Sequence, residues 1–216
     1  MIIPKKLKKG DTIGVVAPSN PIIGENIEEL EKAKKMLERD GYKVVFSKNI
    51  FSNANEYSAT AKEKADDINE MFANKDIDMI WCAKGGENSN SVFDYLDFEI
   101  IKNNPKIIAG FSDITSIINV IANKTGLVTF SATNFKTVAT DETDYSYKQA
   151  IARFSGENAT FDVAKKDCYK TIKEGTAEGE LIGGNLTLTT GLVAGKYKIN
   201  FKNKILFLEE LGYESD

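Results

Sequence analysis

Residues 106–115 read KIIAGFSDIT, and this stretch contains the junction on which the fold depends. The apolar run Ile107–Ala109 is typical of a buried strand, and it stops at Gly110. A helical pattern begins at Ile114, so Ser112 falls at the corner between a strand and a helix. A serine at such a corner is either a helix cap worth about 1 kcal/mol, or a nucleophile whose Oγ lies at a helix N-terminus. The residues around the corner leave both interpretations open.

Strands and helices alternate on both sides of this junction. Runs rich in β-branched residues predict strands, and apolar residues three and four positions apart predict helices. The predicted strands are 13–16, 42–47, 77–83, 106–110 and 127–132, and the predicted helices are 26–41, 60–74, 92–96 and 113–126. Thr60 and Glu63 have the spacing of a capping box. This alternation predicts an α/β fold with a doubly wound parallel sheet of the flavodoxin or Rossmann type.

Three loops should meet at one edge of this sheet. Ligands of such folds bind beyond the carboxyl ends of the strands, which are followed here by residues 18–20, 84–90 and 110–113. The second loop reads KGGENSN. Its two glycines suit a tight turn, or a loop whose N–H groups help to hold an oxyanion or another anion. The loop is neither a P-loop nor a G-x-G-x-x-G motif, and we expect no cofactor.

The chain changes character after about residue 140. The pattern there predicts helices at 147–154 and 186–193, the second capped by Asn185, and an apolar strand KILFLEE at 204–210. This strand ends in Glu209 and Glu210, of which one should point inward. The two carboxylates are either a solvated strand end or the source of a buried group that orients a base. We expect an N-terminal α/β domain over 1–165 and the incomplete start of a second domain over 166–216.

Composition excludes several classes of protein. The chain has 216 residues, of which 42% are hydrophobic and 28% charged, and its net charge is −4. This charge argues against a nucleic-acid partner, and no apolar run reaches the length of about 18 residues that a membrane span needs. The two cysteines, Cys82 and Cys168, form no C-x-x-C motif and favour a cytoplasmic protein with reduced thiols. With no histidine and only two cysteines, a zinc site is not expected.

Taken together, the candidate residues suggest acyl transfer. Ser112 would be the nucleophile, the N–H groups of Gly86 and Asp113 would bind the oxyanion, and Glu209 would supply a carboxylate. The G-x-S-x-G elbow of α/β-hydrolases is disfavoured, because Ile114 stands where that motif has its second glycine.

The order and spacing of several blocks resemble the LD-carboxypeptidase family of serine peptidases, which includes the microcin C immunity carboxypeptidases. The blocks are LKKGDTIGVVAPS, KGGENSN, NNPKIIAGFSDIT, KTGLVTF, LIGGNL and KILFLEE, and they run along essentially the whole chain. The resemblance implies an N-terminal α/β domain, a smaller β-rich C-terminal domain and a homodimer. It also implies a Ser-Glu-His triad, with the nucleophile at Ser112, the glutamate at Glu209 and oxyanion donors at Gly86 and Asp113.

The histidine of that triad is missing, because these 216 residues contain none. We therefore expect the chain to be a fragment of a longer protein and to be nearly inactive by itself. A carboxylate with a pKa of about 4.3, such as that of Glu209, is a weak base for a serine hydroxyl.

Two substrate classes follow from the resemblance. One branch removes a terminal D-alanine from a muropeptide, and the immunity branch cleaves an amide in a peptidyl-nucleotide. The loop with Lys84, Glu87, Asn88 and Ser89 is expected to bind the substrate, and its composition favours the immunity branch. The alternative from another class is a non-catalytic α/β module that binds a carboxylate or phosphate ligand.

Overall fold

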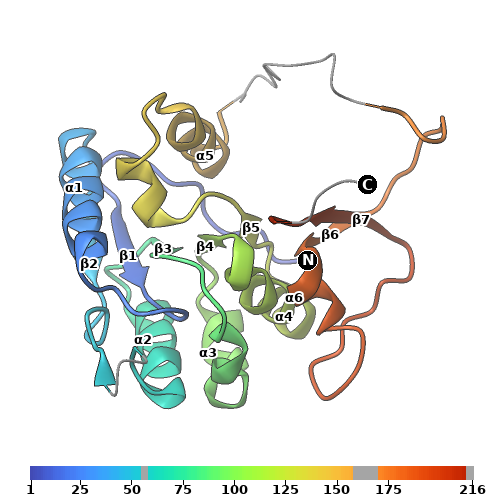
Figure 1. Ribbon diagram of the computed structural model, residues 1–216, viewed down its shortest axis with the longest axis horizontal. Coiled ribbons are helices and arrows are strands. Elements are labelled where there is room, and N and C mark those ends of the chain that lie inside the picture. Colours follow the sequence, from blue (N-terminus) through green and yellow to red (C-terminus); the bar gives the residue numbers. More distant parts are fainter. Residues whose placement is uncertain (55–57, 158–169, 213–216) are drawn as a thin grey trace.

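The computed structural model describes residues 1–54, 58–157 and 170–212 of the chain. A parallel sheet with the strand order β2-β1-β3-β4-β5 lies at its centre, and helices cover both faces (Figure 1). The predicted doubly wound parallel sheet is therefore confirmed. The strands of this sheet are β1 Thr12–Val16, β2 Lys43–Phe46, β3 Met79–Cys82, β4 Ile107–Gly110 and β5 Phe130–Ser131. The helices are α1 Glu25–Arg39, α2 Ala61–Ala73, α3 Phe98–Asn103, α4 Thr115–Thr125, α5 Tyr145–Ser155 and α6 Leu186–Thr190.

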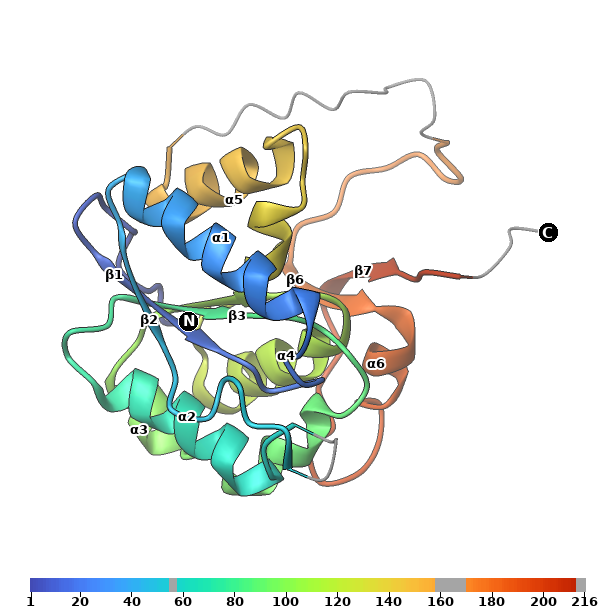
Figure 2. The same cartoon turned by 60° about the vertical axis from the view of Figure 1, so that its left-hand side comes forward.

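Alternate residues of the central strands face two separate apolar cores. Met79 and Trp81 of β3 pack into the core under α1 and α5, and Ile80 and Cys82 of the same strand pack into the core with α2, α3 and α4. Figure 2 shows these two helical layers on opposite sides of the sheet. Trp81 and Cys82 are both completely buried. A strand buried on both faces explains the unbroken apolar runs of the sequence.

The helix boundaries follow the local signals in the sequence. Thr60 and Glu63 form the predicted capping box at the start of α2, with the backbone N–H of Thr60 donating to the Glu63 carboxylate over 2.8 Å. Helix α4 ends at Gly126, which has the left-handed conformation typical of a helix C-terminus. Asn185 caps α6 as predicted, because its Oδ1 accepts a hydrogen bond from the N–H of Leu188 at 3.1 Å.

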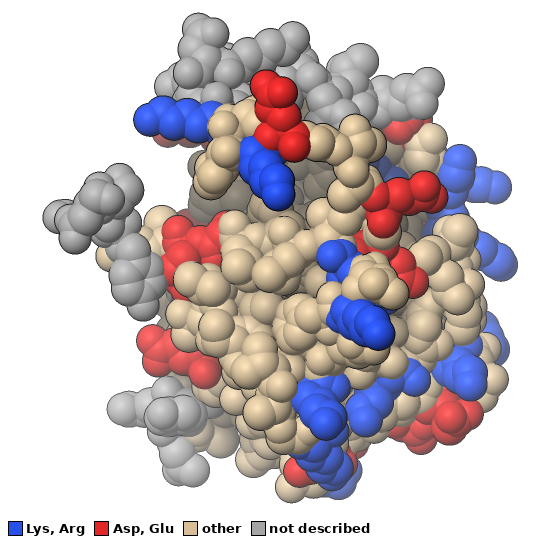
Figure 3. Space-filling model, turned by 90° about the vertical axis from the view of Figure 1, so that its right-hand side faces the viewer, with Lys and Arg blue, Asp and Glu red and all other residues tan. Residues whose placement is uncertain are grey.

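A small second sheet consists of β6 Glu180–Asn185 and β7 Lys204–Glu209, which run parallel. It lies beside α4 and α6 (Figure 1). The face of the molecule on that side has a broad uncharged area in its middle (Figure 3). Exposed apolar side chains of this sheet are Leu181, Leu206, Phe207 and Leu208.

Some element predictions were incomplete or wrong. The glycine-rich segment before Asn185 forms strand β6, which was not predicted, and α3 was missed. The predicted helix at 92–96 is part of a 3-10 helix over Ser89–Tyr95, and further 3-10 helices span Ser112–Ile114 and Phe135–Ala139. Strand β5 covers only residues 130–131 of the predicted 127–132.

Two of the expectations fall outside the described residues. The expected domain boundary at 165/166 lies within 158–169, and Cys168 lies in the same range. Over the described ranges, none of the helices has the length and apolar character that crossing a membrane requires.

Candidate active site

Ser112 lies at the corner between β4 and α4 with an unusual backbone. Its φ is 63°, a value that residues other than glycine rarely adopt. Ser112 also begins the 3-10 turn that leads into α4. The N–H of the preceding Phe111 donates to Oδ1 of Asn134 at 3.1 Å, which fixes the chain as it leaves β4. The backbone of Ser112 is therefore strained. Such outliers are typical of functional sites.

Ser112 does not cap the helix, which was one of the two interpretations that the sequence left open. Among the described residues, no side-chain hydrogen bond caps the start of the 3-10 turn or of α4. The backbone N–H of Thr115 instead bonds to the carbonyl oxygens of Ser112 and Asp113. The partly exposed Ser112 hydroxyl is therefore not needed to begin the helix.

The glycine pair of the loop after β3 lies against this corner. A Cβ atom added to Gly85 would be 3.1 Å from Cβ and 3.2 Å from Oγ of Ser112. Gly86 has a φ of 156°, and a Cβ atom there would overlap the side chains of Ser19 and Asn20. Any other residue at 85 or 86 would displace its neighbours, so the two glycines allow the loops after β1 and β3 to approach Ser112.

The three loops meet at one edge of the sheet, as the sequence predicts. Asn20, after β1, accepts a hydrogen bond from the N–H of Glu87 at 3.2 Å. Ser19 donates from its hydroxyl to the carboxylate of Asp113, which follows β4. These bonds connect the loops after β1, β3 and β4 directly.

Asp113 is the centre of this network. Its side chain is fully buried, and its Oδ2 accepts from the Ser19 hydroxyl and from the N–H of Ser89 at 2.8 Å. Its carbonyl oxygen accepts from the hydroxyls of Ser89 at 2.7 Å and Ser116 at 3.1 Å. Buried carboxylates of this kind are costly unless they are hydrogen-bonded.

The other loop residues differ in exposure. Lys84 and Asn88 are half-buried, Glu87 is exposed and Ser89 is fully buried. Asn88 Oδ1 accepts a hydrogen bond from Nζ of the buried Lys64 at 2.7 Å. Burial lowers the pKa of Lys64, whereas the nearby carboxylate of Asp113 raises it.

The two glutamates at the end of β7 have different surroundings. The carboxylate of Glu210 accepts from the side chains of Asn185 at 2.7 Å and Thr187 at 2.6 Å, so it ties the end of β7 to the start of α6. These bonds, led by that from Thr187, lower the pKa of Glu210 to about 2. Glu209 is half-buried and lies opposite Asn185 in the register of the two strands.

Strand β6, which pairs with β7, is fixed to the first turns of α4. The N–H of Asn185 donates to Oγ1 of Thr115 at 3.1 Å. The side chain of Asn119 donates to the carbonyl of Gly183 at 2.8 Å and accepts from its N–H at 3.3 Å. Two buried polar residues therefore connect α4 to the second sheet.

Sequence reasoning missed several residues of this site. Asp113 was considered only for its backbone N–H, and Lys64, Thr115, Asn119 and Asn134 were not considered. The signal for Lys64 was its position directly before Ala65 on the buried face of α2. Thr115 and Asn119 are polar residues within an apolar helix, a pattern that indicates a polar partner. Nothing local marks Asn134.

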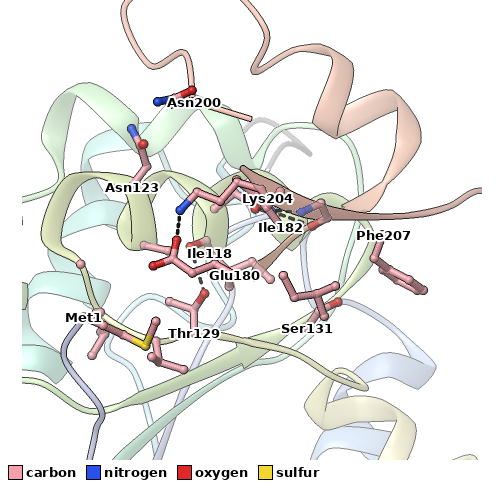
Figure 4. A pocket seen from close by; sticks show the side chains of 17 residues that line it. Met1, Ile118, Asn123, Thr129, Ser131, Glu180, Ile182, Asn200, Lys204 and Phe207 are labelled. Atoms are coloured by element: carbon pink, nitrogen blue, oxygen red, sulfur yellow. Dashed lines mark hydrogen bonds and ion pairs between the residues drawn. The ribbon is translucent and has the colours of Figure 1, made fainter. Parts of the chain in front are cut away.

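A separate cavity of about 370 Å³ lies between the N-terminus, α4, β5 and the second sheet (Figure 4). Apolar side chains such as Ile118, Ile182 and Phe207 line it together with the ion pair of Glu180 and Lys204. Among the described residues that line this cavity, neither Ser112 nor any residue of 84–90 is present. The cavity is therefore distinct from the candidate active site.

Comparisons with known proteins agree with the resemblance that the sequence motifs indicate. The family profile of the LD-carboxypeptidase N-terminal domain matches residues 13–132, and that of the LD-carboxypeptidase C-terminal domain matches residues 178–216. A probable murein peptide carboxypeptidase of Bacillus subtilis is 34% identical over 98% of this chain and 66% of its own length. The microcin C7 self-immunity protein MccF of Escherichia coli is 31% identical over 97% of this chain and 69% of its own length.

The fold agrees with solved structures as well. The crystal structure of an MccF-like protein from Bacillus anthracis matches 97% of this chain and 70% of its own, with a TM-score of 0.84 and 31% identity. The chain spans about two thirds of the length of the curated relatives that it matches.

Proposed function

Because the chain belongs to the LD-carboxypeptidase family of serine peptidases, we propose that it carries the nucleophile of a serine carboxypeptidase. The relatives are carboxypeptidases, which are hydrolases, and a microcin self-immunity protein, as the sequence motifs predict. The observation that carries the proposal is the positive φ of Ser112 at the strand-to-helix corner beside Gly85. No capping bond explains this conformation within the described residues, so the strain serves to expose Oγ.

In the proposed reaction, Oγ of Ser112 attacks the carbonyl carbon of the scissile amide. The N–H groups of Gly86 and Asp113 stabilise the oxyanion, and they lie near the N-terminus of α4, whose dipole favours negative charge. The amine leaves with a proton, and water then hydrolyses the ester of Ser112. Glu209 orients the base of the triad. Its place at the end of β7, which β6 holds beside α4, supports this role.

The base itself is proposed to come from outside these residues. The 216 residues contain no histidine, and a carboxylate of ordinary pKa is a poor base for a serine hydroxyl. We expect the 216-residue chain to be nearly inactive and the complete gene product to be active. If the 216-residue chain and the complete gene product were equally active, the base would lie within residues 1–216. Lys84 would then be the first candidate, forming a Ser-Lys pair with Ser112.

The substrate is proposed to be a peptidyl-nucleotide. The exposed Glu87 and the half-buried Lys84 and Asn88 belong to the same loop as Gly85, and we expect their side chains to contact the substrate. Ser89 is buried and bonded to Asp113, so we now propose that it positions the loop instead of touching the substrate. The similarity to MccF, a microcin C7 self-immunity protein, supports this substrate class.

A muropeptide is the second candidate substrate. The observation that favours it is the 34% identity to a probable murein peptide carboxypeptidase of Bacillus subtilis. In that case Ser112 would release D-alanine from the end of an LD-tetrapeptide.

One assay tests both substrates and the nucleophile. The complete gene product and its Ser112→Ala variant are each incubated with an LD-tetrapeptide and with an aspartyl-adenylate amide. We expect only the unmodified protein to hydrolyse a substrate, and the amide to react faster. Hydrolysis by the Ser112→Ala variant would remove the assignment of the nucleophile. If the unmodified protein binds either compound without turnover, the chain is a non-catalytic binding module.

Our proposals for the oligomeric state and the cellular location of the protein rest on the family resemblance and on the composition. We propose a cytoplasmic homodimer. Sedimentation of the complete gene product at micromolar concentration should give a dimer, and a monomer there would contradict the proposal.

A further inference from the structure

The two carboxylate oxygens of Asp113 have different surroundings. Oδ2 accepts one hydrogen bond from the loop after β1, through Ser19, and one from the loop after β3, through Ser89. Oδ1 is buried and has no hydrogen-bond partner among the described residues. Both donors therefore converge on one oxygen atom, and Asp113 itself directly follows Ser112.

A buried charge in this position needs compensation. Lys64 is 4% exposed, and its Nζ bonds to Asn88 of the loop that carries Ser89. Burial lowers the pKa of Lys64, and the attraction of Asp113 offsets part of this effect. The N-terminus of α4 adds a partial positive charge next to Asp113. A carboxylate kept at such cost serves a purpose that an apolar residue would not.

We propose that the side chain of Asp113 is a positioning residue for Ser112, which holds the loops after β1, β3 and β4 in one arrangement. The inference rests on the proposed function of Ser112 as nucleophile. Gly85 lies against Ser112, and the bond from Ser89 to Asp113 holds the same loop four residues later. Displacing a reacting group by about 1 Å can cost about 100-fold in rate.

Two substitutions separate the hydrogen bonds of Asp113 from its charge. In Asp113→Asn, the single amide oxygen can replace Oδ2 and accept from both Ser19 and Ser89, while the NH₂ group replaces the unpartnered Oδ1. Asp113→Ala removes both bonds but keeps the backbone N–H. In the complete gene product, we expect kcat to fall about 100-fold in Asp113→Ala with little change of KM. In Asp113→Asn we expect most of kcat to be retained.

Asp67 offers a matched control. It is a second buried aspartate, 4% exposed, which accepts from the Ser47 hydroxyl at 2.7 Å and from Asn49, away from Ser112. Asp67→Ala should lower the melting temperature as Asp113→Ala does, but leave kcat unchanged. Ser19→Ala removes one of the two bonds to the carboxylate of Asp113, so it should reduce kcat less than Asp113→Ala does. This variant replaces Asp113→Ala in the test if Asp113→Ala does not fold.

Hydrogen–deuterium exchange gives a readout that does not depend on activity. In Asp113→Ala the amides of residues 84–90 should exchange faster, and in Asp67→Ala they should not. Unchanged kcat and unchanged exchange in Asp113→Ala would overturn the inference, and so would equal losses of kcat in the Asn and Ala variants. If the unmodified protein hydrolyses neither substrate, the proposed function fails, and the exchange of 84–90 still decides whether Asp113 holds the loops.

Discussion

Gly85 is the residue whose replacement affects Ser112 most directly. Its φ is not in the left-handed region, so alanine is compatible with the backbone there. The added methyl group would lie 3.1 Å from Cβ and 3.2 Å from Oγ of Ser112, which is closer than side chains normally approach. Either Ser112 or the loop must shift to accommodate the methyl group, and both movements change the position of Oγ relative to Gly86.

We therefore expect Gly85→Ala to lower kcat of the complete gene product by about tenfold or more. The melting temperature should change by only a few degrees, as is usual for modest overpacking. Gly191→Ala is the matched control, because its added Cβ would meet nothing closer than 3.4 Å. A Gly85→Ala variant with unchanged kcat would show that the loop can move away from Ser112 without cost.

Glu210 makes the stability of the C-terminal part depend on pH. Its hydrogen bonds from Thr187 and Asn185 lower its pKa from 4.5 to about 2. A lowered pKa in the folded state stabilises the protein above pH 4.5, and this contribution disappears as the pH falls towards 2. Glu210→Gln should therefore melt at a lower temperature than the unmodified chain at neutral pH, and the difference should shrink below pH 4.5. A difference that stays constant down to acidic pH would contradict this reading.

At the scale of elements, the contact of α4 with β6 connects the nucleophile to the second sheet. Asn119 makes two hydrogen bonds to the backbone of Gly183 and is 7% exposed. Its loss leaves the half-buried N–H and carbonyl of Gly183 without this partner. We expect Asn119→Ala to lower the free energy of unfolding by about 1–3 kcal/mol in total, because Gly183 is only partly buried and water can replace part of the lost bonding. The substitution should also speed amide exchange in β6 and β7.

Asn123, one turn further along α4, provides the control for this contact. Its side chain makes one bond of 3.5 Å to the carbonyl of Lys198. Asn123→Ala should therefore have a small effect on unfolding and none on exchange in β6 and β7. Equal effects of the two substitutions would show that β6 is not held through Asn119.

The sequence predicted the elements of the central sheet well because their signals are local. The capping box at Thr60 and the β-branched runs required no knowledge of tertiary contacts. Strand β6 was missed because its two glycines, Gly183 and Gly184, suppress a strand pattern. Their positive φ values and the space they leave for β7 and Thr115 explain why glycine is required, and both depend on distant residues.

At the scale of the whole molecule, the topology brings the site together. The strand order β2-β1-β3-β4-β5 places the loops after β1, β3 and β4 at adjacent carboxyl ends, so residues almost 100 positions apart meet. The sequence predicted this convergence and the position of Ser112. It did not predict the buried side chain of Asp113 as the link, because burial of a charged residue depends on its tertiary partners.

The central claim is that Ser112 is the nucleophile, and chemical labelling tests it most directly. The complete gene product is treated with a fluorophosphonate, which reacts covalently with activated serines, and is then digested with trypsin. Cleavage after Lys106 and Lys124 gives the peptide 107–124, which contains Ser112 and Ser116. We predict a single adduct on Ser112 and none in the Ser112→Ala variant. An adduct on Ser116, or no adduct on this peptide in a protein that hydrolyses substrate, would contradict the assignment.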